Sequence, residues 1–231
     1  IGAGLSLLLL RVDAKERQGH PASASLFGEV TEGLRYAWRH AGIGPLLLFA
    51  ALGAILLRAV QEILPPFVDR LFERGVESLA VLTACFGIGA LVAGLWIAAR
   101  GRLEGTTRIA VTSTLIQALA TAGFVATNWF AVGMLCAAAI GAAASVHGVS
   151  VQTLLQSATD PALRGRMLSL WGLITRACPA LGALALGAAG EAFGLRWPTL
   201  GAAGAFLVVF AWGWAMRVKM EVALERSDGK S

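Results

Sequence analysis

Six long runs of apolar residues constrain this chain more than any other feature of its sequence. Each run is about 20 residues long, which lets a helix cross roughly 30 Å of hydrocarbon at about 1.5 Å per residue. None alternates between apolar and polar residues, and in lipid only helices and closed barrels satisfy the backbone. We therefore predict an all-α membrane protein with six transmembrane helices, at residues 44–64, 79–99, 107–126, 129–151, 167–190 and 198–216.

The composition agrees with a membrane protein. Hydrophobic residues make up 57% of the chain and charged residues 14%, whereas a soluble domain is nearer half apolar and a quarter charged. The three cysteines, Cys85, Cys136 and Cys178, lie inside apolar runs without the spacing of a zinc or redox motif. We interpret them as small buried hydrophobic residues and expect no cofactor and no metal.

The segments outside the apolar runs divide the chain further. Residues 1–10 are apolar but too short to cross a bilayer, so we interpret them as the end of a transmembrane helix whose beginning is missing. Residues 11–43 form a polar linker that ends in a short amphipathic helix. The six-helix domain occupies residues 44–217, and residues 218–231 form a tail.

Lys and Arg are concentrated in alternate connections between the runs. Residues 11–43, 100–108, 153–166 and 217–231 hold 14 of the 19 basic residues, and the other connections hold three. The positive-inside rule therefore places the linker and the tail in the cytoplasm. Since these charges lie between apolar runs and are not gathered on one face, we expect contact with membrane lipid and no nucleic-acid partner.

Small residues recur within the runs at helical spacing, as in Ala137, Gly141 and Ser145. Such residues let helix backbones approach closely, which a bundle in lipid needs because lipid tails give helices no hydrophobic reason to associate. The pattern predicts a closely packed bundle, without indicating a particular function.

A more specific pattern follows the fourth run. Residues 152–156 read QTLLQ and residues 160–170 read DPALRGRMLSL, with PALG at 179–182, GAAG at 187–190 and EGLRY at 32–36. This pattern resembles the enterobactin-exporter-like and macrolide-efflux-like subfamily of the major facilitator superfamily, and the resemblance covers nearly the whole chain.

The resemblance implies a fold and a function. The six helices would be helices seven to twelve of a twelve-helix transporter, and their partner would be an N-terminal six-helix half that this sequence lacks. Two such halves rock around a site at the membrane midplane. The resemblance implies a bacterial inner (plasma) membrane antiporter that exports a drug-like compound or a siderophore, driven by protons. The alternatives are an uptake symporter of the same fold and a non-transporting six-helix scaffold or partner subunit.

Three charged residues inside the runs are candidates for the transport pathway, because a charge within the bilayer costs roughly 2.5 to 3.5 kcal/mol on insertion scales. Arg58 and Glu62 are four residues apart and could pair on one helix, near the outer end marked by Pro65-Pro66. A helix-end ion pair and a transport role both remain open for them. Arg176 lies near the middle of its run, with no acid within two turns, and we expect it to face the interior. Its partner there could be an acid of another helix, a backbone carbonyl or an anionic or polar substrate, so a structural role and a substrate-binding role both remain open.

Polar residues within the runs are further candidates. His147 could relay protons near neutral pH, or could be a buried histidine bonded to a neighbour. Gln61, Gln117 and Gln152 could line the pathway or bridge helices.

A charged set lies in the connections assigned to the cytoplasm. These charges could exchange partners as a gate, which the resemblance favours, or could only set topology, with Asp160-Pro161 capping the next helix. The set comprises Arg100, Arg102, Asp160, Arg164 and Arg166.

Sequence motifs of enzymes find no support. Gly87, Gly89 and Gly94 superficially suggest a nucleotide loop, but they lie inside an apolar run with no strand before them. Because HExxH, GxSxG and paired acids are also missing, we expect no enzyme, and the energy for transport would come from a gradient.

Overall fold

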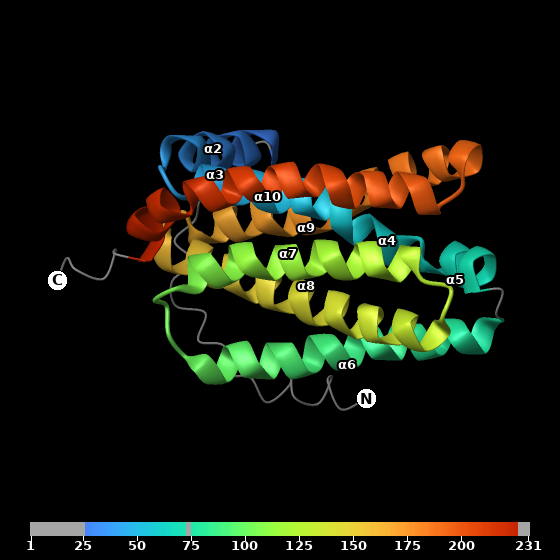
Figure 1. Ribbon diagram of the computed structural model, residues 1–231. Helices are drawn as coiled ribbons and strands as arrows, with labels where there is room; N and C mark the ends of the chain where they lie inside the picture. The colour runs from blue at the N-terminus through green and yellow to red at the C-terminus, as the bar shows by residue number, and fades with distance from the viewer. Residues whose placement is uncertain (1–25, 73–74, 226–231) are drawn as a thin grey trace, which may run out of the picture.

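The computed structural model describes residues 26–72 and 75–225, and the regular elements of this part of the chain are all helices, with no strand (Figure 1). The predicted all-helical membrane fold is confirmed, since six helices are long and apolar enough to cross a bilayer. The predicted helix end at residues 1–10 lies outside the described residues. The elements are α2 (Leu26–Arg39), α3 (Ile43–Gly53), η1 (Ala54–Arg58), α4 (Ala59–Glu62), α5 (Leu64–Phe72), α6 (Val76–Arg100), α7 (Thr106–Ala126), α8 (Phe130–Ala158), α9 (Arg164–Phe193) and α10 (Arg196–Glu225).

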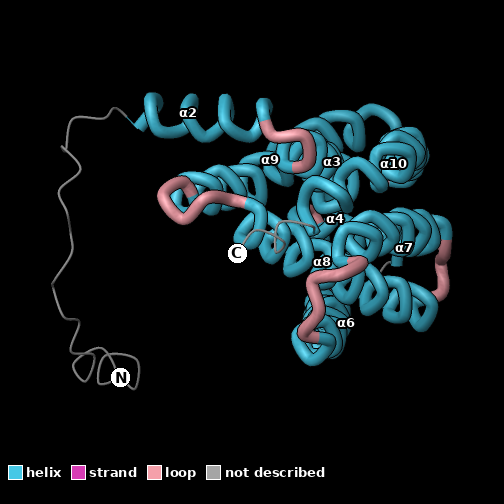
Figure 2. The backbone as a smooth tube through the Cα atoms, turned by 90° about the vertical axis from the view of Figure 1, so that its left-hand side faces the viewer, coloured by secondary structure: helices cyan, strands magenta, loops and turns pink. Residues whose placement is uncertain are grey.

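The six spans pack side by side as a bundle (Figures 1 and 2). The first span, Ile43–Glu62, consists of α3, η1 and α4 and packs against α9 and α10. α8 packs against both α6 and α7, and α7 also packs against α10. Viewed from the end, α8 lies between α6 and α9 (Figure 2).

Glycines bring several helix backbones into contact. A Cβ atom at Gly141 of α8 would overlap the carbonyl oxygen of Phe86 in α6, and one at Gly89 would overlap the carbonyl of Ala138. A Cβ atom at Gly182 of α9 would likewise overlap the carbonyl oxygen of Ile55 in η1. The small residues of the sequence therefore place α6 on α8, and α9 on the first span, at backbone distance.

The first span ends at Glu62, and a further helix follows it. The chain breaks at Ile63 and then continues as α5, whose first turn contains both prolines. Proline is tolerated there because the first amides of a helix have no partner within it. Phe72 of α5 is buried and packs edge-on against Phe124, with ring centroids 5.6 Å apart. The structure therefore adds a short helix, α5, after the span, which the apolar run did not indicate.

α10 continues nine residues beyond residue 216, where its apolar run ends. Met220 and Leu224 in this last part are buried, so the segment is amphipathic rather than uniformly apolar. The carboxylate of Glu225 accepts hydrogen bonds from the backbone amides of Gly105 and Thr107, at 2.6 and 2.7 Å. The end of α10 thus caps the beginning of α7.

The connections divide between the two ends of the bundle. α2, the α6–α7 and α8–α9 connections and the end of α10 lie at one end (Figure 1). α5 and the α7–α8 and α9–α10 connections lie at the other end.

Candidate functional site

A π-helical segment, η1, interrupts the first span at Ala54–Arg58. π-helical turns are rare, and they are found frequently at functional sites. Arg58 is the last residue of this segment, and the α9 backbone meets it at Gly182. No sequence signal predicted the π turn, because its residues are ordinary helix formers.

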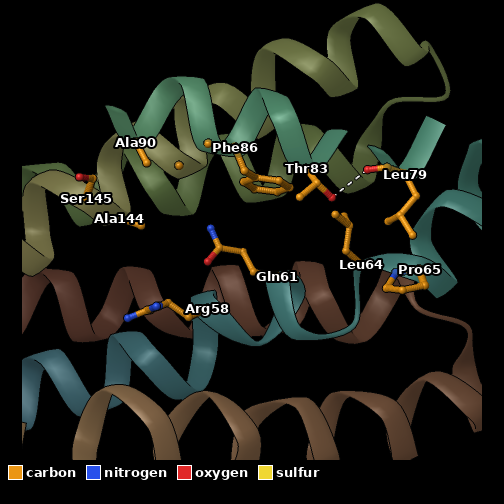
Figure 3. A pocket seen from close by; sticks show the side chains of 12 residues that line it. Arg58, Gln61, Leu64, Pro65, Leu79, Thr83, Phe86, Ala90, Ala144 and Ser145 are labelled. Carbon is orange, nitrogen blue, oxygen red and sulfur yellow. Dashed lines mark hydrogen bonds between the residues drawn. The ribbon is translucent and has the colours of Figure 1, made fainter. Parts of the chain in front are cut away.

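Arg58, at the end of this π-helical turn, lines an open groove of about 650 Å³. This volume lies within the range of about 300 to 1,000 Å³ that is usual for small-molecule sites. Figure 3 shows Arg58 and Gln61 below the groove, with α6 and α8 above it. Its lining residues are Arg58, Gln61, Leu64, Pro65, Leu79, Thr83, Phe86, Gly87, Ala90, Gly141, Ala144 and Ser145.

The guanidinium of Arg58 has no hydrogen-bond or ion-pair partner among the described residues. Its Nε atom is buried without an acceptor, although a buried donor that stays unpaired costs about 1 to 3 kcal/mol. The ion pair with Glu62 that the spacing allowed does not form in the described structure, and the Glu62 side chain is exposed. Glu62 therefore acts on Arg58 only through its charge at a distance and not through a direct contact.

Arg58 lies near the middle of the bundle and not near its outer end. It shares a second cavity with Gln117, the twelfth of the 21 residues of α7, and with Ala144, the fifteenth of the 29 residues of α8.

This second cavity is small, at about 20 Å³, which is roughly the space that one water molecule needs. The polar residues that line it come from four elements and include Thr114, Gln117, His147 and Thr175 besides Arg58. Gln117 is 3% exposed and its Nε2 atom is buried without an acceptor. Arg58 consequently separates the open groove from a polar space in the centre of the bundle.

His147 is buried, with 8% of its surface exposed. Its Nδ1 atom lies 2.8 Å from the carbonyl oxygen of Ala110 in α7, and its ring meets that of Phe49 edge-on. With Nδ1–H donating to Ala110, Nε2 is left as the acceptor. His147 therefore has the hydrogen-bonded neighbour that a structural histidine requires. Its ring also borders the small cavity that Arg58 lines.

Arg176 does not face the interior of the six described helices. Its side chain is exposed on α9 and lines neither of the two cavities. The buried face of α9 includes Pro179, Gly182 and Leu186, and Arg176 is outside it. Gln152, at the end of α8, is exposed as well.

The five charged residues predicted as a gate lie in two separate connections. Arg100 closes α6 and its Nη2 atom donates to the Glu104 carbonyl at 2.8 Å, while Arg102 is exposed. The remaining residues, Asp160, Arg164 and Arg166, belong to the α8–α9 connection and the first turn of α9.

The expectation that Asp160-Pro161 caps the following helix is wrong. Residues 161–163 form a turn closed by a hydrogen bond from the Leu163 amide to the Asp160 carbonyl, at 2.9 Å. α9 therefore begins only at Arg164, after an N-cap residue, Leu163, that makes no side-chain cap.

His40 lies close to the α8–α9 connection, and the sequence did not predict a role for it. Its Nδ1 atom accepts hydrogen bonds from the amides of Gly42 and Ile43, at 3.2 and 3.3 Å, and so caps α3. Burial lowers the pKa of His40, and the nearby charge of Asp160 opposes that shift only in part. A neutral ring is what the cap requires, because a protonated Nδ1 cannot accept.

The described residues contain no group of three or more His, Cys, Asp or Glu side chains that could hold a metal ion. The three cysteines are free thiols. The groove with its buried cation is thus the feature with the clearest capacity to bind a solute.

Comparison with known proteins identifies a family. A model of a major facilitator family, described as transmembrane secretion effectors, matches residues 5–229. Comparisons with curated proteins and with solved structures gave no match. The match spans nearly the whole chain and agrees with the six spans and the central groove. The chain therefore belongs to the transmembrane secretion effector family of the major facilitator superfamily, and is a multi-pass membrane transporter.

Proposed function

We propose that the protein exports a small drug-like compound or a siderophore by alternating access, driven by the inward movement of protons. The observation that carries this proposal is the groove halfway through the bundle, with Arg58 and Gln61 in its wall. Secondary transporters bind their substrates near the midplane, commonly where a helix departs from regular α-helical geometry. The family description as secretion effectors supports the outward direction.

The six helices act as the C-terminal half of a larger transporter, together with a second six-helix half. Arg176 supports this arrangement, because it is exposed at the thirteenth of the 30 positions of α9. A charge facing lipid at that depth would be costly. A second half, or a water-filled pathway between the halves, gives the exposed face of α9 a polar neighbour.

The end of the bundle that contains α2 and the last turn of α10 faces the cytoplasm of a bacterial inner membrane. The basic residues of the connections at this end support that orientation. The charges of Arg100, Arg102, Asp160, Arg164 and Arg166 serve there as a gate, in which pairs form and break as the two halves move.

His147 carries the coupled proton. Its support is its location, since the ring borders the polar cavity next to Arg58. His147→Asn keeps an amide in the position of Nδ1, which can donate a hydrogen bond to Ala110 but cannot titrate near neutral pH. We expect this variant to lose proton-driven transport while its melting temperature stays close to that of the wild type. Unchanged transport would show that His147 is only structural.

Inverted membrane vesicles test the proposed function directly. In these vesicles the cytoplasmic side of the membrane faces outward. An imposed proton gradient, acidic inside, should therefore drive candidate drugs or siderophores into vesicles that contain the full-length protein. Uptake should stop on addition of a protonophore and should be missing from vesicles without the protein. If a gradient of either sign leaves solute movement unchanged for a broad panel of compounds, the proposal of proton-driven export is wrong.

A further inference from the structure

The strongest unexplained feature of the described structure is the charge on Arg58. The side chain has a buried Nε atom without an acceptor, and it forms no ion pair with a described residue. Partly buried cations in proteins are usually compensated by an anion or by several acceptors, because an unpaired charge away from water is expensive. A ligand that enters the groove is in a position to supply that anion.

The groove offers Arg58 on one side and mainly apolar surface on the other. Figure 3 shows Arg58 at one end, with Leu64, Pro65 and Leu79 at the opposite end and the ring of Phe86 above. An occupant therefore meets a guanidinium at one end and, along the rest of its length, a mainly apolar wall that also includes Gln61, Thr83 and Ser145. Such a surface complements an elongated molecule that bears its charge at one end.

We infer that the groove selects amphiphilic anions, compounds with a carboxylate, phenolate or sulfonate that binds Arg58 and an aromatic or aliphatic body that lies against Phe86 and Leu79. Arg is suited to this task because its planar guanidinium donates two parallel hydrogen bonds to such groups. This inference rests on the proposed function for the role of the groove as a substrate site, and it adds the charge of the substrate.

A matched pair of probes tests the inference. 2-Naphthoate and 2-naphthamide have the same ring and nearly the same size but differ in charge. Equilibrium dialysis against the purified full-length protein in detergent measures the affinity of each. We expect the carboxylate to bind about tenfold more tightly than the amide, as a charge-assisted hydrogen bond in a partly buried site permits.

Two substitutions of equal charge identify the residue responsible. Arg58→Gln should bring the affinities of naphthoate and naphthamide within about twofold of each other, since it removes the charge-assisted contact. Arg108→Gln removes the same charge from an exposed position at the start of α7, outside the groove. This control should keep the preference for the anion.

A third variant keeps the inference testable if Arg58→Gln does not fold. Gly87 lines the groove and a Cβ atom there would meet no other atom within 4 Å, so Gly87→Leu fills the groove without a clash with its neighbours. Both probes should then bind more weakly.

Equal binding of the two probes to the wild type, a preference that survives in Arg58→Gln, or unchanged binding in Gly87→Leu would each overturn the inference. These results are separate from the vesicle experiment. Selective binding without transport would contradict the proposed function alone, whereas transport of neutral compounds without an anion preference would contradict only this inference.

Discussion

At the scale of single residues, Arg176 gives the sharpest test of the two-half arrangement. Arg176→Ala in the full-length protein should abolish transport while its amount in the membrane stays unchanged, because the side chain would contact the pathway or the second half and not the six-helix core. Transport in vesicles and immunoblots of the membrane fraction measure these two quantities. Arg108→Ala, which removes a charge at the exposed end of α7, serves as the control. Normal transport by Arg176→Ala would contradict the prediction.

His40 predicts a dependence of stability on pH. Its folded-state pKa is lower than the unperturbed value of about 6.5, so the neutral form stabilises the fold. This stabilisation is complete above the unperturbed pKa and is lost as the pH falls through the lowered pKa. The melting temperature should therefore fall between pH 7.5 and pH 5.

The matched variant for this test is His40→Asn, whose side-chain carbonyl can accept a hydrogen bond from the Gly42 amide without titrating. Its melting temperature should fall less over the same pH range. An identical fall in both proteins would rule out His40 as the source of the pH dependence.

Residue chemistry alone identified part of the site. Arg58, Gln61 and His147 were predicted from the cost of polar groups in lipid, and the structure brings them to adjoining cavities. The direction in which Arg176 faces could not be predicted, because a lone charge in a run carries no information on helix rotation. Thr83 and Phe86 were missed because a groove wall of ordinary membrane residues has no signature in sequence.

At the scale of elements, the contact between α6 and α8 predicts a clear difference between two glycines of α8. Gly141→Ala would push a methyl group into the Phe86 carbonyl, and overpacking of this kind costs about 1–3 kcal/mol. Gly148→Ala meets nothing within 4 Å and should gain up to about 1 kcal/mol from helix propensity. Thermal unfolding in detergent compares the two variants, and equal melting temperatures would mean that α6 and α8 pack less closely than described.

The elements themselves were largely predictable, because long apolar runs in lipid can only be helices. Their ends were not, since α10 continues as an amphipathic helix and α5 begins at a pair of prolines. The π turn also gave no signal, because its residues are ordinary helix formers.

At the scale of the whole molecule, the contact of Glu225 with α7 joins distant parts of the chain. Glu225→Gln should destabilise the protein by about 0.5–2 kcal/mol, the usual effect of losing a helix cap. Glu221→Gln on the same helix removes an equal charge from a side chain that forms no hydrogen bond with another described residue, and should have little effect. Chemical denaturation of both variants measures the difference. A similar loss in both would assign the effect to net charge.

The same contact has a consequence for the order in which the protein matures. Glu225 follows Thr107 by 118 residues, so the ribosome has released α7, α8 and α9 before the carboxylate that caps α7 exists. Synthesis proceeds from the N-terminus, and the amides of Gly105 and Thr107 must therefore rely on water until Glu225 is made. The six helices can become a finished bundle only after the last of them is made, which leaves an interval in which chaperones and proteases can distinguish complete chains from interrupted ones.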